Sequence, residues 1–181
     1  TFAQNAAGYT ARLLQVFVSP MAGTVTSAIP SLSPVTISNN ATLDVNDTVA
    51  TIGSLSGAAG TRVTLGQGTL ITGGDNTSTT FSGVISSTAG YTGDSFTKTG
   101  TGAMTLAGAN TYTGRTTLSA GALIVTNDNN LGAATAPLVF NGATLQTNAA
   151  ITSASRPITL NAAGGTVNTN GFDSTFSGTV T

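Results

Sequence analysis

A short pattern that recurs along the chain constrains its fold more than any other feature. An apolar triplet is followed by a corner of small or turn-forming residues and then by another apolar residue. The five occurrences run from Val35-Thr36-Ile37 to Leu43, Val63-Thr64-Leu65 to Leu70, Thr116-Thr117-Leu118 to Leu123, Leu138-Val139-Phe140 to Leu145 and Ile158-Thr159-Leu160 to Val167. The last three anchors, Leu123, Leu145 and Val167, are spaced 22 residues apart. Strand, corner and strand at this period predict one coil of a right-handed parallel β-solenoid.

The composition agrees with an all-β chain made of short strands and tight corners. There are 23 glycines, 39% of the residues are hydrophobic, and the mean hydropathy of +0.23 argues against disorder. At about 20 residues per coil, the chain length predicts roughly eight or nine coils, with the solenoid occupying residues 36–181. The alternative is an antiparallel β-sandwich, which needs frequent hairpin turns. Asn-Gly, the strongest hairpin signal, occurs only at residues 141–142 and 170–171, so the solenoid is favoured.

Residues 1–35 differ from the rest and are interpreted as an extended capping or donor segment. Three of the five prolines, Pro20, Pro30 and Pro34, fall in this part of the chain. Its most apolar stretch, residues 13–18, is far shorter than the roughly 20 residues that a membrane-spanning helix needs. No transmembrane helix is therefore expected.

The residue types that are missing exclude most catalytic chemistry. The chain has no His, Cys, Trp or Glu, its net charge is −1, and Lys98 is its only lysine. A Ser-His-Asp triad, a thiol nucleophile and the usual ligand sets for zinc, iron–sulfur clusters and haem are therefore impossible. There is no basic patch for a nucleic-acid partner. We predict no catalytic residue, no cofactor and no metal site.

The remaining polar residues are interpreted structurally. The six acidic residues are Asp44, Asp47, Asp75, Asp94, Asp128 and Asp173, and most lie beside Asn or Gly, as solvated turn residues do. A weak calcium site or a polysaccharide-cleaving site built from these aspartates is the disfavoured alternative. Corner asparagines are expected to form hydrogen-bonded ladders between coils, and aromatic residues to pack inside rather than to stack on sugars.

Three arginines, Arg62, Arg115 and Arg156, recur near the strand repeats. We expect all three to be solubilising residues on the outer faces of the coils, where long charged side chains are usually found.

Residues 96–125 read FTKTGTGAMTLAGANTYTGRTTLSAGALIV. This stretch resembles the passenger-associated strand repeat of autotransporter-type surface proteins of Gram-negative bacteria. The resemblance rests on Lys98 before Gly-Thr-Gly, on the Gly-Ala-Asn-Thr-Tyr-Thr-Gly core at residues 108–114, and on Ala-Gly before Leu123. Arg115, where a second glycine usually follows, and Met104 depart from the pattern. The resemblance implies a parallel β-helix exported to the cell surface or beyond, and it implies no particular activity.

Two functional interpretations follow, both non-enzymatic and extracellular. The first is a structural subunit that assembles head to tail into a surface or secreted fibre, because few charged residues guard the strand edges. Its only partner would be a second copy of the chain. The candidate assembly residues are Leu13, Leu14, Val16, Phe17, Val18, Phe176 and Val180. The alternative is an adhesin or passenger stalk that binds host or cell-surface glycans.

Overall fold

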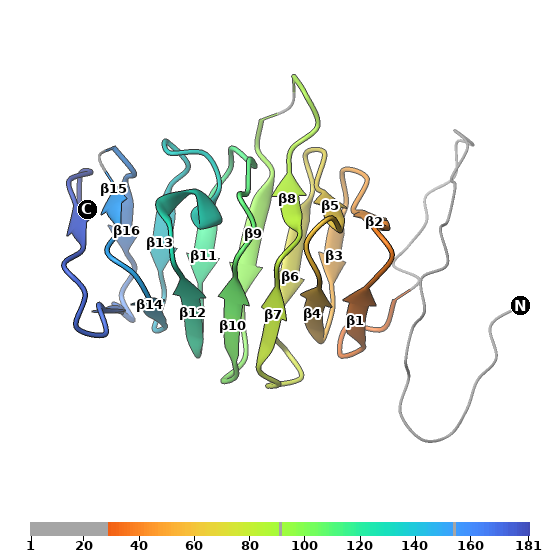
Figure 1. The fold of residues 1–181 in the computed structure, drawn as a ribbon, viewed down its shortest axis with the longest axis horizontal. Helices are drawn as coiled ribbons and strands as arrows, with labels where there is room; N and C mark the ends of the chain where they lie inside the picture. The colour runs from red at the N-terminus through yellow and green to blue at the C-terminus, as the bar shows by residue number, and fades with distance from the viewer. Residues whose placement is uncertain (1–28, 91, 154) are drawn as a thin grey trace, which may run out of the picture.

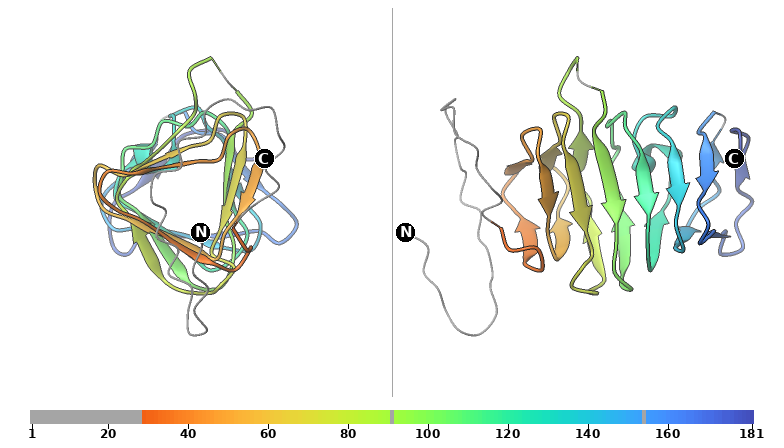
Figure 2. Two further views of the ribbon diagram at one scale, coloured as in Figure 1. Left: turned by 90° about the vertical axis from the view of Figure 1, so that its right-hand side faces the viewer. Right: turned by 180° about the vertical axis from the view of Figure 1, so that it is seen from behind.

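Apolar and β-branched residues at alternate positions form short strands, and these strands stack into a parallel β-solenoid (Figure 1). The computed structural model describes residues 29–90, 92–153 and 155–181. Viewed along its axis, the strands of successive coils superpose and form the walls of one tube (Figure 2).

Two long sheets and an interrupted third face make up these walls. The seven-stranded sheet contains β1 (Pro34–Ile37), β4 (Ser54–Gly57), β7 (Thr79–Phe81), β10 (Ala103–Leu106), β12 (Ala122–Val125), β14 (Thr144–Thr147) and β17 (Thr166–Asn168). The six-stranded sheet contains β3 (Val49–Thr51), β6 (Thr69–Thr72), β9 (Ser95–Lys98), β11 (Thr116–Leu118), β13 (Leu138–Phe140) and β16 (Ile158–Leu160). The third face contains β2 (Thr42–Asp44), β5 (Arg62–Thr64) and β8 (Val84–Ser86), and then, near the other end, β15 (Thr152–Ser153) and β18 (Thr175–Phe176).

Every strand pair in the described residues is parallel, which confirms the solenoid and rules out the antiparallel sandwich. The structure has about six coils rather than the predicted eight or nine. Within the described residues the first strand begins at Pro34, and equivalent residues are up to 26 positions apart, as between Thr69 and Ser95. At about 4.8 Å per coil, six steps give a rod roughly 29 Å long.

The repeating triplets meet in the predicted register at the end of the chain. Leu123 pairs with Leu145, and Leu145 pairs with Val167, so the three anchors form one column in the seven-stranded sheet. The two earlier occurrences lie at other corners: Leu43 pairs with Val63 on the third face, and Leu70 pairs with Phe96 in the six-stranded sheet. The same local pattern therefore serves three different corners, because each of them needs a tight turn between two apolar strands.

Asparagine and glycine supply the backbone conformations of the corners. Asn39 and Asn40 follow β1 with φ angles of 55° and 56°, and Asn170 and Gly171 follow β17 with φ angles of 50° and 83°. Asparagine tolerates this left-handed region better than most side chains do, and glycine adopts it without strain.

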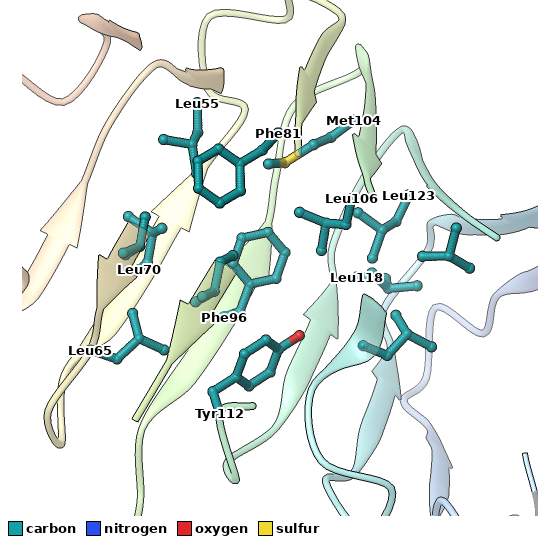
Figure 3. Packing of buried hydrophobic residues seen from close by; sticks show 14 of the residues in the cluster. Leu55, Leu65, Leu70, Phe81, Phe96, Met104, Leu106, Tyr112, Leu118 and Leu123 are labelled. Carbon is teal, nitrogen blue, oxygen red and sulfur yellow. The ribbon is translucent and has the colours of Figure 1, made fainter. Parts of the chain in front are cut away.

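The core consists of inward-facing columns that run along the tube axis (Figure 3). Leu55, Phe81, Leu106, Leu123 and Leu145 come from the seven-stranded sheet, and all of them are fully buried. Leu70, Phe96, Leu118 and Leu138 come from the facing six-stranded sheet and are equally buried. Burial of these side chains is the main stabilising contribution, since each contributes about 1.5–3 kcal/mol when it leaves water.

The third face is interrupted in the middle of the rod. In the fourth coil, residues 107–115 connect β10 to β11 without a named strand, and in the fifth coil a short 3₁₀-helix, η1 (Asp128–Leu131), takes the place of a strand. No helix among the described residues is long and apolar enough to cross a bilayer.

Candidate functional site

The interruption of the third face coincides with a group of polar side chains buried inside the solenoid. Asp94, Lys98, Asn110, Asn130 and Arg156 are all at most 3% exposed. They come from four successive coils. Because buried polar side chains need hydrogen-bond partners, this polar cluster is the part of the interior that calls for an explanation.

Asn110 and Asn130 form an amide ladder across three coils. The Asn110 side chain accepts a hydrogen bond from the backbone N–H of Ile85 in the preceding coil (2.8 Å) and donates one to the carbonyl of Asn130 in the next (2.5 Å). Asn130 in turn donates to the carbonyl of Gly108 (2.9 Å). The two amides thus take over the backbone pairing where no strands continue it. The predicted bonding between corner asparagines is seen where the Asn170 side chain donates to the side-chain oxygen of Asn148 in the preceding coil, at 3.2 Å.

The two glycines of the Gly-Ala-Asn-Thr-Tyr-Thr-Gly core allow the coils to approach closely. A Cβ on Gly108 would lie 1.8 Å from the carbonyl oxygen of Gly83, and a Cβ on Gly114 would lie 1.3 Å from that of Asp94. Both distances are far below any tolerated contact. These glycines are therefore required because the backbone of the preceding coil occupies the space of a side chain.

Tyr112 fills the interior between these glycines. Its ring is fully buried and tilted against Phe96, with 6.3 Å between the ring centroids (Figure 3). Its hydroxyl lies 2.6 Å from the hydroxyl of Thr116. The interpretation of this tyrosine as a packing residue rather than a sugar-stacking platform is confirmed.

Burial gives Tyr112 a measurable effect on alkaline stability. Burial raises the pKa of the Tyr112 phenol far above its ordinary value of about 10, and this outweighs the hydrogen bond shared with Thr116, which lowers the pKa. Since the unfolded chain ionises first, stability conferred by the neutral phenol is complete below about pH 10 and falls as the pH rises further. Replacing Tyr112 with phenylalanine should flatten this decline in the free energy of unfolding. Urea unfolding measured from pH 8 to pH 11, in increments of about one pH unit, tests this. An unchanged slope would contradict a buried phenol.

Lys98 points into the solenoid and caps backbone carbonyls at the corner between β9 and β10. Its ammonium donates to the carbonyls of Thr99 and Gly100 in its own coil and to that of Ala120 in the next, at 3.5 Å. Burial lowers the pKa of Lys98, and the charge of the nearby Asp75 opposes this. The lysine before Gly-Thr-Gly is therefore a buried link between coils.

Asp94 holds the third coil to the fourth at the base of the loop between β8 and β9. Its carboxylate accepts hydrogen bonds from the Ser87 hydroxyl (2.8 Å), from the Thr113 hydroxyl (3.0 Å) and from the backbone N–H of Gly114 (3.2 Å). The prediction that this aspartate is a solvated turn residue is wrong, because its side chain is turned inward to pair with these donors.

Arg156 is the clearest departure from the sequence analysis. The sequence predicts this residue on an outer face, where Arg62 and Arg115 do lie, but the structure buries it fully. Its guanidinium pairs with the Asp128 carboxylate at 3.0 Å and donates to the carbonyls of Leu131 (3.0 Å) and Ala136 (2.7 Å). Asp128 begins η1, Leu131 ends it and Ala136 lies beyond it, so the arginine of the sixth coil fastens the helix that replaces a strand in the fifth.

The remaining aspartates are not brought together. Asp44 accepts from Thr64 and from the Asn46 N–H, Asp47 accepts from the Gln67 N–H, and Asp173 is exposed. Partial burial raises the pKa of Asp75, but hydrogen bonds from Ser54 and Thr77 outweigh this and lower it. Across the described ranges, no three His, Cys, Asp or Glu side chains form a group that could hold a metal ion.

The candidate assembly residues are only partly covered by the structure. Leu13, Leu14, Val16, Phe17 and Val18 lie outside the described residues. Phe176 packs partly against the core, whereas Val180 is 58% exposed and forms a parallel bridge with Ile158.

The sequence of this chain is similar to known proteins in two respects. The family model described as passenger-associated-transport-repeat matches residues 96–125. The adhesin BmaC autotransporter of Brucella suis biovar 1 (strain 1330) is 40% identical over 112 residues, which are 61% of this chain and 3% of that protein. The chain thus spans a small fraction of this relative's length. No solved structure matches it.

The matched residues 96–125 contain Lys98, Asn110, Tyr112 and the two close-approach glycines, so the motif and the coil-stacking contacts coincide. Residues 96–125 therefore match a passenger-associated-transport-repeat, which in this chain is built into a parallel β-solenoid.

Proposed function

We propose that this chain is part of a non-enzymatic, adhesin-like passenger displayed outside a Gram-negative cell. The observation that carries the proposal is the use of the repeat's distinctive residues. Lys98 and Asn110 face the interior and donate hydrogen bonds to the next coil, and the buried Tyr112 packs against Phe96 of the preceding coil, which leaves none of them for catalysis. The similarity to an autotransporter adhesin supports the extracellular location.

In this function the solenoid is a stiff support, and its outer faces make the contacts. Thr36 and Ser56, and likewise Thr69 and Ser95, pair their hydroxyls across neighbouring coils on the outside of the rod. Such rows of hydroxyls on an almost uncharged surface suit hydrogen bonding to cell-surface glycans, which are themselves rich in hydroxyls. The comparison with an adhesin favours this passenger function over a dedicated fibre subunit.

Two measurements test the proposal. Antibodies against the purified chain should label intact cells of the bacterium that encodes it, and labelling only after permeabilisation would contradict the extracellular location.

Beads coated with the chain should bind mammalian or bacterial cells saturably, and a glycan array should identify the ligand class. Absence of saturable binding at every coating density would reduce the function to that of a spacer.

A further inference from the structure

The corner between β8 and β9 stands out from the wall of the rod beyond the neighbouring corners (Figure 1). Its residues Thr88, Ala89 and Gly90 are all exposed, and none of the three makes a hydrogen bond to another coil within the described residues. Gly90 has a φ angle of 86°, and a Cβ placed on it would have no heavy atom within 4 Å. We call residues 88–90 the exposed tip, because the described part of the rod offers it no polar attachment.

The base of the same corner is fixed to the next coil. The Ser87 hydroxyl donates to the carboxylate of Asp94 (2.8 Å) and accepts from the backbone N–H of Thr113 (3.1 Å). The Asp94 carboxylate also accepts from the Thr113 hydroxyl (3.0 Å). A change in the exposed tip therefore leaves Ser87 and Asp94, on its two sides, bonded to the fourth coil.

A second corner of similar composition shows what the exposed tip lacks. Residues 58–60, which read Ala-Ala-Gly, are exposed as well. However, the Ala58 carbonyl accepts from the Thr61 hydroxyl (2.7 Å) and from the Thr61 N–H (3.3 Å). A Cβ on Gly60 would also lie 2.3 Å from the side-chain oxygen of Asn40 in the preceding coil. This corner is bonded and packed against its neighbour, so exposure alone does not distinguish the exposed tip.

We propose that the exposed tip is a cleavage site for extracellular serine endoproteases that accept a small residue before the scissile bond. Exposed loop tips of small and polar residues are the preferred places where folded proteins are nicked. Residues 87–94 separate β8 from β9, so the tip enters a protease cleft without the unpairing of any strand. Water hydrolyses the peptide bond between Ala89 and Gly90, which leaves a carboxylate on Ala89 and an amine on Gly90.

The rod stays in one piece after this cut, because strands on its two sides are paired with each other. β6 and β7, which precede the cut, pair in parallel with β9 and β10, which follow it. Leu70 pairs with Phe96, Phe81 pairs with Leu106, and all four side chains are fully buried. The cut therefore produces two fragments that remain associated until the rod unfolds. This inference goes beyond the proposed function, which requires no cleavage.

Limited proteolysis of the full 181-residue chain with pancreatic elastase tests the proposal. Mass spectrometry should show cleavage after Ala89, with residues 90–181 as the C-terminal fragment. This bond should be cut at least about tenfold faster than the bonds after Ala58 and Ala59, because the corner at residues 58–60 must open before a protease can bind it. Size-exclusion chromatography should show that the two fragments elute together and separate only in denaturant.

Two matched variants complete the experiment. Ala89→Asp should abolish the cut at this bond, because a charged side chain does not fit the small specificity pocket of elastase. Ala59→Asp adds the same charge at another exposed alanine and should leave the cut unchanged. An uncut tip in the parent chain would overturn the proposal, as would equal cutting of the two corners or fragments that separate without denaturant. None of these results would affect the proposed surface function, because an uncut rod that binds glycans satisfies it.

Discussion

Replacing Arg156 with methionine is expected to lower the free energy of unfolding by about 3–5 kcal/mol, although methionine fills a similar volume. The substitution leaves the Asp128 carboxylate without its cation and the carbonyl of Ala136 without its arginine donor, and it leaves the carbonyl of Leu131 with only the long bond from the Thr116 hydroxyl, at 3.4 Å. An unpaired buried acceptor costs about 1–3 kcal/mol, so the loss comes from the groups left behind. Urea unfolding followed by circular dichroism measures it.

The chain provides its own controls for this experiment. Arg62 and Arg115 are both exposed, as solubilising side chains on outer faces are. Methionine at either position should change the free energy of unfolding by no more than about 0.5 kcal/mol. If all three variants unfolded at the same urea concentration, Arg156 would have no role in fastening η1.

Replacing Gly114 with alanine is expected to have an effect of similar size through a different cause. The added Cβ would lie 1.3 Å from the carbonyl oxygen of Asp94, which is backbone and cannot rotate away. The third and fourth coils would have to separate, at a cost of about 3 kcal/mol or more. The separation would also weaken the bond from the Gly114 N–H to Asp94.

Gly74 is the matched control for Gly114. A Cβ at that position would lie 3.2 Å from the end of the flexible Leu32 side chain and 4.0 Å from the Ser31 carbonyl oxygen, an ordinary contact, and its backbone does not require glycine. Alanine at residue 74 should therefore leave the urea midpoint nearly unchanged. Equal midpoints for the two alanine variants would mean that coils three and four are not in close backbone contact.

The fold was predictable from the sequence because its repeat is visible in the apolar residues themselves. The 22-residue spacing of Leu123, Leu145 and Val167 matches their pairing in the structure. The number of coils was overestimated because coil length varies, from 19 residues between Ala103 and Ala122 to 26 between Thr69 and Ser95. Extra residues are inserted at the corners and leave the strands unchanged, so dividing the chain length by a constant period overestimates the number of coils.

The buried polar cluster was not predictable from hydropathy. Lys98 and Arg156 have the same local appearance as exposed residues, and only the stacking of coils places carbonyl groups around them. The sequence does hold a signal for Lys98. This residue aligns with Thr72 of β6 and Leu118 of β11, which both face inward, so the same position in β9 is expected to face inward too. For Arg156 the sequence holds no such signal, because its partners in η1 interrupt the repeat.

The stacking of the coils in register is the central claim, and a distance measurement by electron paramagnetic resonance tests it most directly. The chain contains no cysteine, so spin labels can be placed at will. Thr51, Val139 and Thr159 lie in one outward column of the six-stranded sheet. Labels at residues 51 and 139 span four coils, and labels at residues 51 and 159 span five. Stacking in register predicts separations of about 19 and 24 Å, which differ by one coil spacing. Separations that do not increase by one coil spacing would contradict it.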